Sequence, residues 1–289
     1  MENLKITNHV RSSTLPTATH PLIASAEENL RRLKSSEGTS ISSHATICQR
    51  LDGLGKLYEC IDNFLRFPLS EQVLSHEKHA KSLEQVSNGS LKVLDTCNII
   101  KDTFSQMKEN VQLLESSLRR KRSGESNLSN EIDTYVASNK KLNKVIYRCF
   151  QALKNTEKSN IIEIEDAEFT TLISLIEGVE DISITVLEST LSFIFHPKMR
   201  SKAGGLSLIS KLLKPKRVSC EVVDISEFEK IDIELLLLQS KQTDHSQIQS
   251  VLKRLGTFES RIQELEYRIG SIFRHLIKTR VSLLNILNH

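Results

Sequence analysis

A heptad seam near the C-terminus is the feature that most constrains what this chain can fold into. From Ser246 to His289, seam residues recur at alternating steps of three and four. The seam consists of Ile248, Val251, Leu255, Phe258, Ile262, Leu265, Ile269, Ile272, Leu276, Thr279, Leu283 and Ile286. Thr279 is its one polar member. This spacing predicts a long helix with an apolar face that partner helices must cover.

Further apolar residues widen this face in the second half of the segment. They stand beside the seam positions and are Phe273, Ile277, Val281, Leu284 and Leu287. A helix that is apolar on several sides is normally enclosed by several neighbours, so we expect this end to be core. Because upstream segments have apolar stripes of their own to cover, the seam is predicted to close within one chain. The protein is therefore expected to be a monomer.

Upstream segments repeat the helical spacing of apolar residues. The predicted helices cover residues 21–37, 40–67, 69–86, 91–122, 128–153, 172–194 and 226–238. Pro21 suits the first turn of a helix, and Pro68 ends the helix that precedes it. Asn88-Gly89 is interpreted as a break between two helices. Gly53 either weakens the second helix locally or lets another helix approach closely.

Composition agrees with a helical fold. The 289 residues include ten Gly, five Pro and no Trp, which is sparse for an all-β or α/β protein. The predicted fold class is all-α: an elongated multi-helix bundle with a long C-terminal coiled-coil-like helix. Residues 1–18 are rich in Ser and Thr and are predicted to form a disordered tail, while residues 19–289 form a single helical domain.

The charge pattern reverses abruptly in the middle of the chain. Residues 159–197 hold eight acidic residues and no Lys or Arg, whereas residues 198–217 hold seven basic residues and no acid. The seven are Lys198, Arg200, Lys202, Lys211, Lys214, Lys216 and Arg217. We expect them in a basic loop, residues 198–220. This loop either contacts an anionic membrane surface, at about 1 kcal/mol per cation, or neutralises the acidic helix beside it, which is the simpler interpretation.

No catalytic or cofactor-binding motif is present. The sequence lacks a Gly-rich phosphate loop, a GxSxG motif, an HExxH motif and a cluster of Cys and His. His76 and His79 lie one turn apart, but no third metal ligand can be identified near them. We therefore expect no enzyme activity, no catalytic residue, no cofactor and no metal site.

Charge and cysteine usage limit the partners and the compartment. A net charge of +3 gives no reason to expect a nucleic-acid partner. Five widely spaced cysteines predict reduced thiols and a cytoplasmic location. No apolar run is long enough to cross a bilayer, so we expect a soluble or peripheral protein. The first twenty residues are also faintly similar to a plastid transit peptide, which makes a plastid the alternative compartment.

Several stretches resemble the BYPASS-like proteins, a plant-specific family. They are Arg11 to Pro16 with His20-Pro21, Leu51 to Leu54 with Leu57-Tyr58, Gly89 to Leu91 with Leu94 to Cys97, Leu118 to Arg122, Ser207 to Leu212, and Phe273 to Asn285. The closing run from Phe273 is the most specific of these. The resemblance implies a mainly helical plant protein associated with root and shoot development, with members linked to restraining a mobile growth-regulating signal. It supplies no catalytic residue.

Two molecular functions stay open on this sequence. An all-α interaction or scaffold protein with an unidentified protein partner fits best, because every recognisable feature is a packing feature. The alternative is a peripheral membrane protein that uses the basic loop. An enzyme that makes or modifies a small signal would need a polar pocket, which the sequence does not reveal.

Overall fold

The computed structural model describes residues 21–36, 43–122, 128–154, 166–194, 227–240 and 245–288, and every regular element among them is helical. The elements are α1 (Pro21–Ser35), α2 (His44–Leu65), α3 (Pro68–Leu74), η2 (Glu77–His79), α4 (Ala80–Arg122), α5 (Leu128–Lys154), α6 (Ala167–Ile194), α8 (Glu227–Ser240) and α9 (His245–Asn288). The predicted all-α fold is confirmed. The predicted tail, residues 1–18, and the basic loop, residues 198–220, lie outside the described residues.

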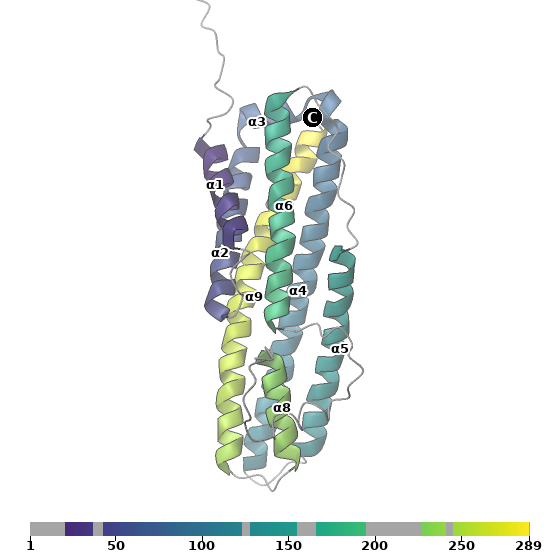
Figure 1. Ribbon diagram of the computed structural model, residues 1–289. Helices are drawn as coiled ribbons and strands as arrows, with labels where there is room; N and C mark the ends of the chain where they lie inside the picture. Colours follow the sequence, from purple (N-terminus) through teal and green to yellow (C-terminus); the bar gives the residue numbers. More distant parts are fainter. Residues whose placement is uncertain are drawn as a thin grey trace, which may run out of the picture.

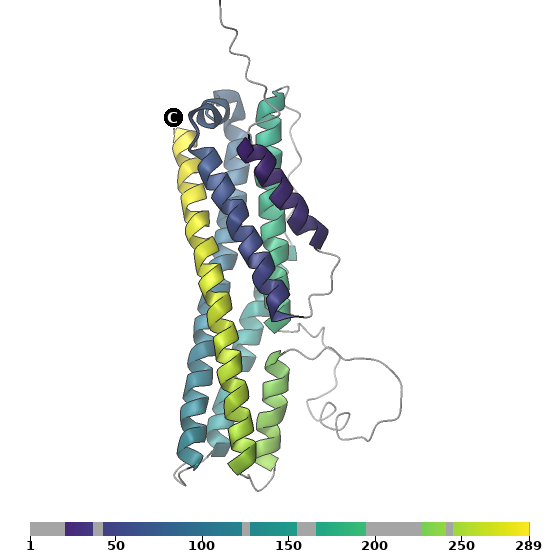
Figure 2. The ribbon, with the colours of Figure 1, turned by 90° about the vertical axis from the view of Figure 1, so that its left-hand side faces the viewer.

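Two long helices, α4 and α9, pack together along the length of the bundle (Figure 1). In the upper half of Figure 1, α2 and α6 complete the bundle, and α1 lies against both. In the lower half, α5 and α8 complete it instead, with α8 placed end to end below α6. Figure 2 shows α9 and α4 along one side of the molecule, with α6 and α8 on the other. Two four-helix layers therefore share one central pair.

Local sequence signals set several helix ends. Pro21 begins α1 and Pro68 begins α3, where a missing amide hydrogen costs nothing. The hydroxyl of Ser43 accepts a hydrogen bond from the Thr46 amide at 3.2 Å and caps α2. The carboxylate of Asp166 caps α6 in the same way, accepting from the amides of Glu168 and Phe169 at 3.1 Å. The bond from the Phe169 amide lowers the pKa of Asp166, partial burial acts in the opposite direction, and a hydrogen bond from Lys78 lowers the pKa further.

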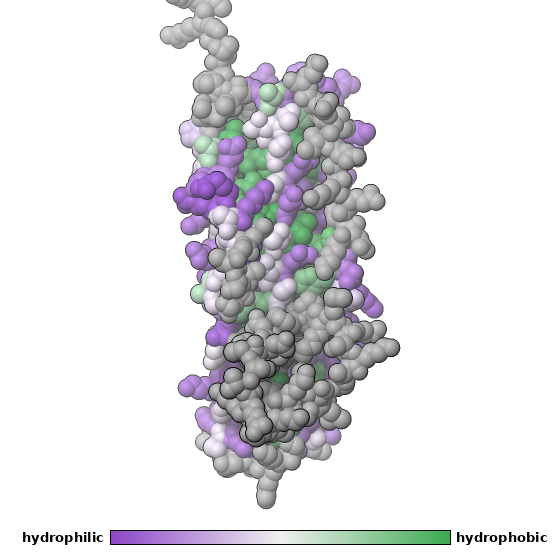
Figure 3. Space-filling view, viewed as in Figure 1, coloured by the Kyte–Doolittle hydropathy of each residue, from purple (hydrophilic) through white to green (hydrophobic). Residues whose placement is uncertain are grey.

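The predicted seam is the buried face of α9. All twelve seam residues are buried, including Thr279, and they face α2 and α4 in the upper half of the bundle and α4 and α8 in the lower half. On the face viewed in Figure 3, apolar side chains lie in the furrows beside α6 while hydrophilic side chains gather at the outer edges. Each helix thus buries one side, and the seam closes within one chain.

The widened face of α9 is not enclosed, which corrects one expectation. Ile277 is 42% exposed, Val281 is 51% exposed and Leu284 is 38% exposed. Phe273 and Leu287 are partly buried against the core. The neighbours of α9 cover its seam and the flanks next to it, and three apolar side chains on its outer side stay in contact with solvent.

The expected break at Asn88-Gly89 is also wrong. The helix α4 runs continuously from Ala80 to Arg122, and the helix predicted over residues 69–86 is replaced by α3, η2 and the start of α4. The carboxyl group of Glu180 on α6 packs against the backbone of Gly89, so that a Cβ atom there would overlap it. Gly89 therefore permits a close approach of two helices and is not a turn signal. Gly53 likewise permits a close approach of α1 to α2, because a Cβ atom added there would lie 3.0 Å from the side chain of Leu33.

Polar side chains between helices fix how the helices align. The hydroxyl of Tyr58 on α2 lies 2.8 Å from that of Ser183 on α6. The thiol of Cys97 on α4 donates to the carbonyl of Ile269 on α9 at 3.6 Å. Burial raises the pKa of this thiol to about 12, so it stays protonated and keeps donating at neutral pH. If α2 shifted along α6, or α4 along α9, these buried groups would lose their hydrogen-bond partners.

Candidate protein-interaction site

The helix α9 carries an exposed apolar stripe. It consists of Ile277, Val281 and Leu284, and we call it the outer stripe. Tyr267, ten residues before Ile277 on the same helix, is 72% exposed. The three residues of the stripe are separated by four and then three positions, which places them in one row on the helix surface.

The outer stripe runs beside the groove between α4 and α9. Arg280 donates a hydrogen bond to the carbonyl of Ser87 on α4, which aligns the two helices at this level. Leu91 lies one turn beyond Ser87 on α4 and is itself 36% exposed. Apolar surface from both helices is thus available along the same side of the bundle.

A shallow pocket of about 520 Å³ continues this surface toward the middle of the bundle. It is lined by Lys101, Lys108, Gln263, Glu266, Tyr267, Gly270, Phe273, Arg274 and Ile277. The described residues that line it come from α4 and α9, and Ile277 belongs to both the pocket and the outer stripe. The pocket and the stripe therefore form one continuous surface.

Positive charge dominates the pocket. The ammonium group of Lys101 lies 5.0 Å from the centre of the Phe273 ring, and Lys108 pairs with Glu266 at 2.6 Å. Partial burial raises the pKa of Glu266, but the hydrogen bonds from Lys108 and Ser105 outweigh it, so the pKa is lowered and the carboxylate is ionised at neutral pH. Three cations, with Arg274, face this single carboxylate, which leaves a surface suited to acidic groups.

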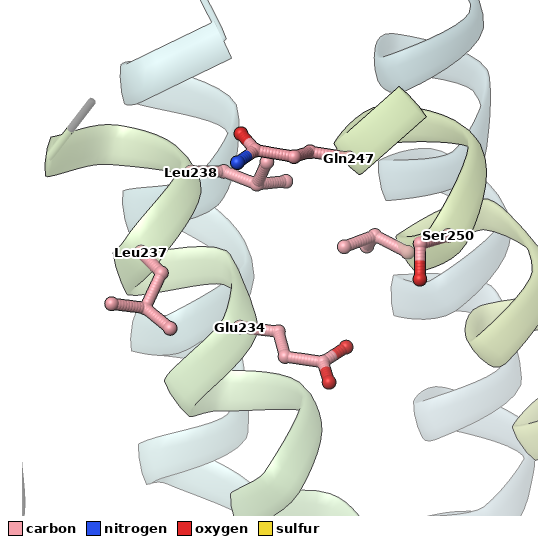
Figure 4. A pocket seen from close by; sticks show the side chains of 6 residues that line it. Glu234, Leu237, Leu238, Gln247 and Ser250 are labelled. Atoms are coloured by element: carbon pink, nitrogen blue, oxygen red, sulfur yellow. The ribbon is translucent and has the colours of Figure 1, made fainter. Parts of the chain in front are cut away.

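A second pocket lies between α8 and α9 (Figure 4). Its volume is about 190 Å³, and its lining includes Leu237, Leu238, Gln247 and Ser250. The carboxylate of Glu234 points across toward α9, where it pairs with Arg254 at 2.6 Å. Ligand sites usually measure about 300–1,000 Å³, so this pocket is small for a substrate.

A buried polar cluster joins α2 to α9 within the Phe273 to Asn285 run. The carboxylate of Asp62 accepts a hydrogen bond from the Thr279 hydroxyl at 2.7 Å and lies 2.5 Å from Nδ1 of His275. Asp62 is buried, and His275 is largely shielded from solvent. This cluster explains the polar residue in the seam: Thr279 satisfies a buried carboxylate.

The residues proposed from the sequence for anionic contacts cannot be placed. Lys198, Arg200, Lys202, Lys211, Lys214, Lys216 and Arg217 all lie outside the described residues.

The His76 and His79 pair is described, and its rings meet edge-on at 5.9 Å. His79 is fully buried, stacks on Phe169 at 3.6 Å, and has its Nδ1 atom 3.0 Å from the carbonyl of Val73. Its surroundings are those of a packed core residue.

Sequence reasoning missed a group of side chains that the fold brings together. His44 and Cys48 on α2 lie beside Glu264 on α9, with all three possible ligand atoms within 4.8 Å of one another. The spacing of His44 and Cys48, one helical turn apart, was a signal in the sequence. Glu264 is distant in the chain, and only the packing of α2 on α9 reveals it.

Comparison with known proteins identifies the family. The family model described as Protein BPS1, the BYPASS family, matches residues 50–286. The chain belongs to this family. The match includes the outer stripe, the Asp62 cluster and the whole of the seam. No curated protein and no solved structure matches the chain. Among the described residues of this BYPASS-family chain, no helix is long and apolar enough to cross a membrane.

Proposed function

We propose that this BYPASS-family protein is a non-enzymatic interaction protein, which binds an amphipathic helix of a protein partner along the outer stripe. The observation that carries the proposal is the exposure of Ile277, Val281 and Leu284 in one row on a helix whose opposite face is core. A partner helix with apolar residues at matching three- and four-residue steps would cover this row.

The charge of the adjoining pocket specifies the partner further. Lys101, Lys108 and Arg274 outnumber the single carboxylate of Glu266. A partner helix with acidic residues beside its apolar row would pair with these cations, whereas a basic helix would be repelled. The partner is thus expected to be an acidic amphipathic helix from another protein.

Site-specific photo-cross-linking tests this proposal. A photoreactive residue at position 281 is compared with one at position 145, because Val145 on α5 is also an exposed apolar residue, at 42%. We expect plant extracts to give a cross-linked peptide at position 281 alone, with apolar residues at helical spacing and flanking acids. Cross-linking at both positions alike, or at position 281 only to a second copy of this chain, would contradict the proposal.

Binding of the identified peptide provides the quantitative check. The double substitution Ile277→Ser and Leu284→Ser should weaken peptide binding at least about tenfold. Each apolar side chain contributes on the order of 1 kcal/mol or more to the binding free energy when the peptide buries it. Arg274→Glu should weaken it further and make it less sensitive to salt. Val145→Ser with Tyr147→Ser, on α5, should leave the affinity unchanged.

A second function, peripheral membrane binding, rests on the run of seven cations without an acid in residues 198–217. Such a run attracts anionic lipid by about 1 kcal/mol per cation. Sedimentation with anionic vesicles tests it: binding should fall with added salt and fall again when Lys211, Lys214, Lys216 and Arg217 are changed to Gln. Equal binding by the changed protein, or none by the native one, would instead favour charge neutralisation of the acidic helix.

We further propose that this binding serves root and shoot development from the cytoplasm. The support is family membership together with the expected reduced cysteines. Complementation of plants that lack the protein tests it, with the outer-stripe variant expected to fail and the α5 variant expected to succeed. A fluorescent fusion found in plastids would overturn the cytoplasmic assignment.

A further inference from the structure

A cluster of three metal-ligand side chains lies where the start of α2 packs on the middle of α9. Nε2 of His44 is 3.6 Å from a carboxylate oxygen of Glu264 and 3.7 Å from the sulfur of Cys48. The three ligand atoms lie within 4.8 Å of one another. His44 and Cys48 are one turn apart on α2, so they project side by side, and Glu264 comes from the facing helix.

These separations are close to those of a tetrahedral zinc site. Bonds of about 2.0–2.3 Å from zinc to nitrogen, oxygen and sulfur place neighbouring ligand atoms roughly 3.3–3.6 Å apart. The distances from Nε2 of His44 to the Glu264 oxygen and to the Cys48 sulfur agree with this separation within a few tenths of an ångström. The third pair of ligand atoms, from Cys48 and Glu264, lies within 4.8 Å, and the Glu264 side chain is 46% exposed, which leaves room for a small rotation toward the thiol.

Surrounding groups hold the carboxylate in place. Arg268 binds one oxygen of Glu264 at 2.9 Å, which leaves the other oxygen directed at His44. Asp52 in turn accepts a hydrogen bond from Arg268 at 2.9 Å. The pair of carboxylates outweighs the one guanidinium, so the local charge favours a cation even before the thiol ionises. Nε2 of His44 also lies 3.4 Å from the carbonyl of Arg261, a contact that metal binding would replace.

We propose that His44, Cys48 and Glu264 form a zinc-binding site that links α2 to α9. The mixed nitrogen, sulfur and oxygen donor set suits Zn²⁺ better than Ca²⁺ or Mg²⁺, which take oxygen ligands. Three protein ligands leave the fourth position to water. Because the imidazole and the thiol come from the first two turns of α2, the metal fastens this end of the helix to α9. This site is separate from the outer stripe and does not depend on the proposed function.

Protonation of the thiol sets the pH dependence of this site. Burial raises the pKa of Cys48; Glu264 and Asp52 add to this, and Arg268 opposes it. Zinc must therefore displace one thiol proton at neutral pH, and binding releases that proton.

Titration of the full-length, metal-free protein with Zn²⁺ and with Co²⁺ tests the proposal. We expect one equivalent of zinc to bind with a Kd of about 1 µM or lower at pH 7.5. Cobalt should give the intense visible bands of a tetrahedral complex together with a sulfur-to-cobalt charge-transfer band in the near ultraviolet. That band reports a thiolate ligand directly.

Matched variants separate this site from other thiols and imidazoles. Cys48→Ser should abolish the charge-transfer band and weaken zinc binding at least about a hundredfold, whereas Cys149→Ser, at a buried cysteine on α5, should change neither. Glu264→Gln keeps the shape of an exposed side chain, so it tests the carboxylate with little change in packing, and it should weaken binding about tenfold or more. Zinc binding that survives both Cys48→Ser and Glu264→Gln, or a cobalt complex without the thiolate band, would overturn the proposal.

Discussion

Glu180 places a carboxyl group between α6 and α4, where it packs on the backbone of Gly89. Burial raises the pKa of Glu180 well above its usual value, with smaller contributions from Glu177 and Asp181, and Lys92 opposes the shift. Within the described part of the chain, its Oε1 atom has no hydrogen-bond partner. Folding therefore favours the protonated acid, and ionisation of Glu180 destabilises the native state.

Replacement of this carboxyl group should stabilise the protein in a pH-dependent way. Protonated Glu180 makes its full contribution to the free energy of unfolding below the pKa that the group has in the unfolded chain, about 4.3. This contribution is lost as pH rises through the raised pKa of Glu180 in the folded protein. Glu180→Gln should therefore raise the free energy of unfolding at pH 9 by roughly 1–3 kcal/mol and change it little at pH 4. Urea unfolding at both pH values measures this, with the exposed Glu84→Gln as a control. Destabilisation that is larger at pH 9 than at pH 4 would contradict this prediction, because it would show that the ionised carboxylate has a stabilising partner.

At the scale of elements, the contact between α4 and α6 depends on Gly89. Gly89→Ala should destabilise the protein by about 1–3 kcal/mol, because the new methyl group overlaps the Glu180 side chain. In a Glu180→Ala background the same change should become neutral or stabilising by about 0.5–1 kcal/mol, since alanine is the better helix former. A double-mutant cycle in urea provides the measurement. The same cost in both backgrounds would show that Gly89 is needed for another reason.

The seam of α9 should be the most sensitive part of the bundle. Ile269 and Leu276 are almost completely buried, so Ile269→Ala and Leu276→Ala should each cost roughly 2–5 kcal/mol. Together they could unfold a domain whose total stability is about 5–15 kcal/mol. Val281→Ala, on the outer stripe, is the matched control and should cost no more than about 0.5 kcal/mol. A seam double mutant that melts like the native protein would mean that α9 is not core.

The sequence predicted correctly the helix faces whose apolar pattern repeats. It failed where a single contact between two helices determines the structure. Alternating three- and four-residue steps identified all twelve seam positions, because a repeated pattern averages over local exceptions. Asn88-Gly89 is a dipeptide typical of turns. Only the position of Glu180 on another helix shows why α4 continues through it. The exposure of Ile277 and Leu284 was missed for a related reason, since apolar spacing shows that a face exists but not whether a neighbour covers it.

Across the whole molecule, the fold brings together residues that are remote in the chain. The pairing of Asp62 with His275 and the cluster of His44, Cys48 and Glu264 both depend on α2 packing beside α9. Periodicity gives each helix a buried face, but it does not say which faces meet. The apolar excess on α9 was visible in the sequence, although its outer residues were expected to be buried and are exposed. For the candidate metal site the sequence offered only the one-turn spacing of His44 and Cys48, and it did not indicate Glu264 as their neighbour.

The central claim is that one chain buries its own seam and keeps the outer stripe for a different protein. Light scattering after size-exclusion chromatography tests it most directly, over a hundredfold range of protein concentration, for the native protein and for Ile277→Ser with Leu284→Ser. We predict the monomer mass of 32.8 kDa for both proteins at every concentration. A native mass that rises toward that of a dimer, while the stripe variant stays monomeric, would contradict the claim, because a second copy would then be the occupant of the stripe.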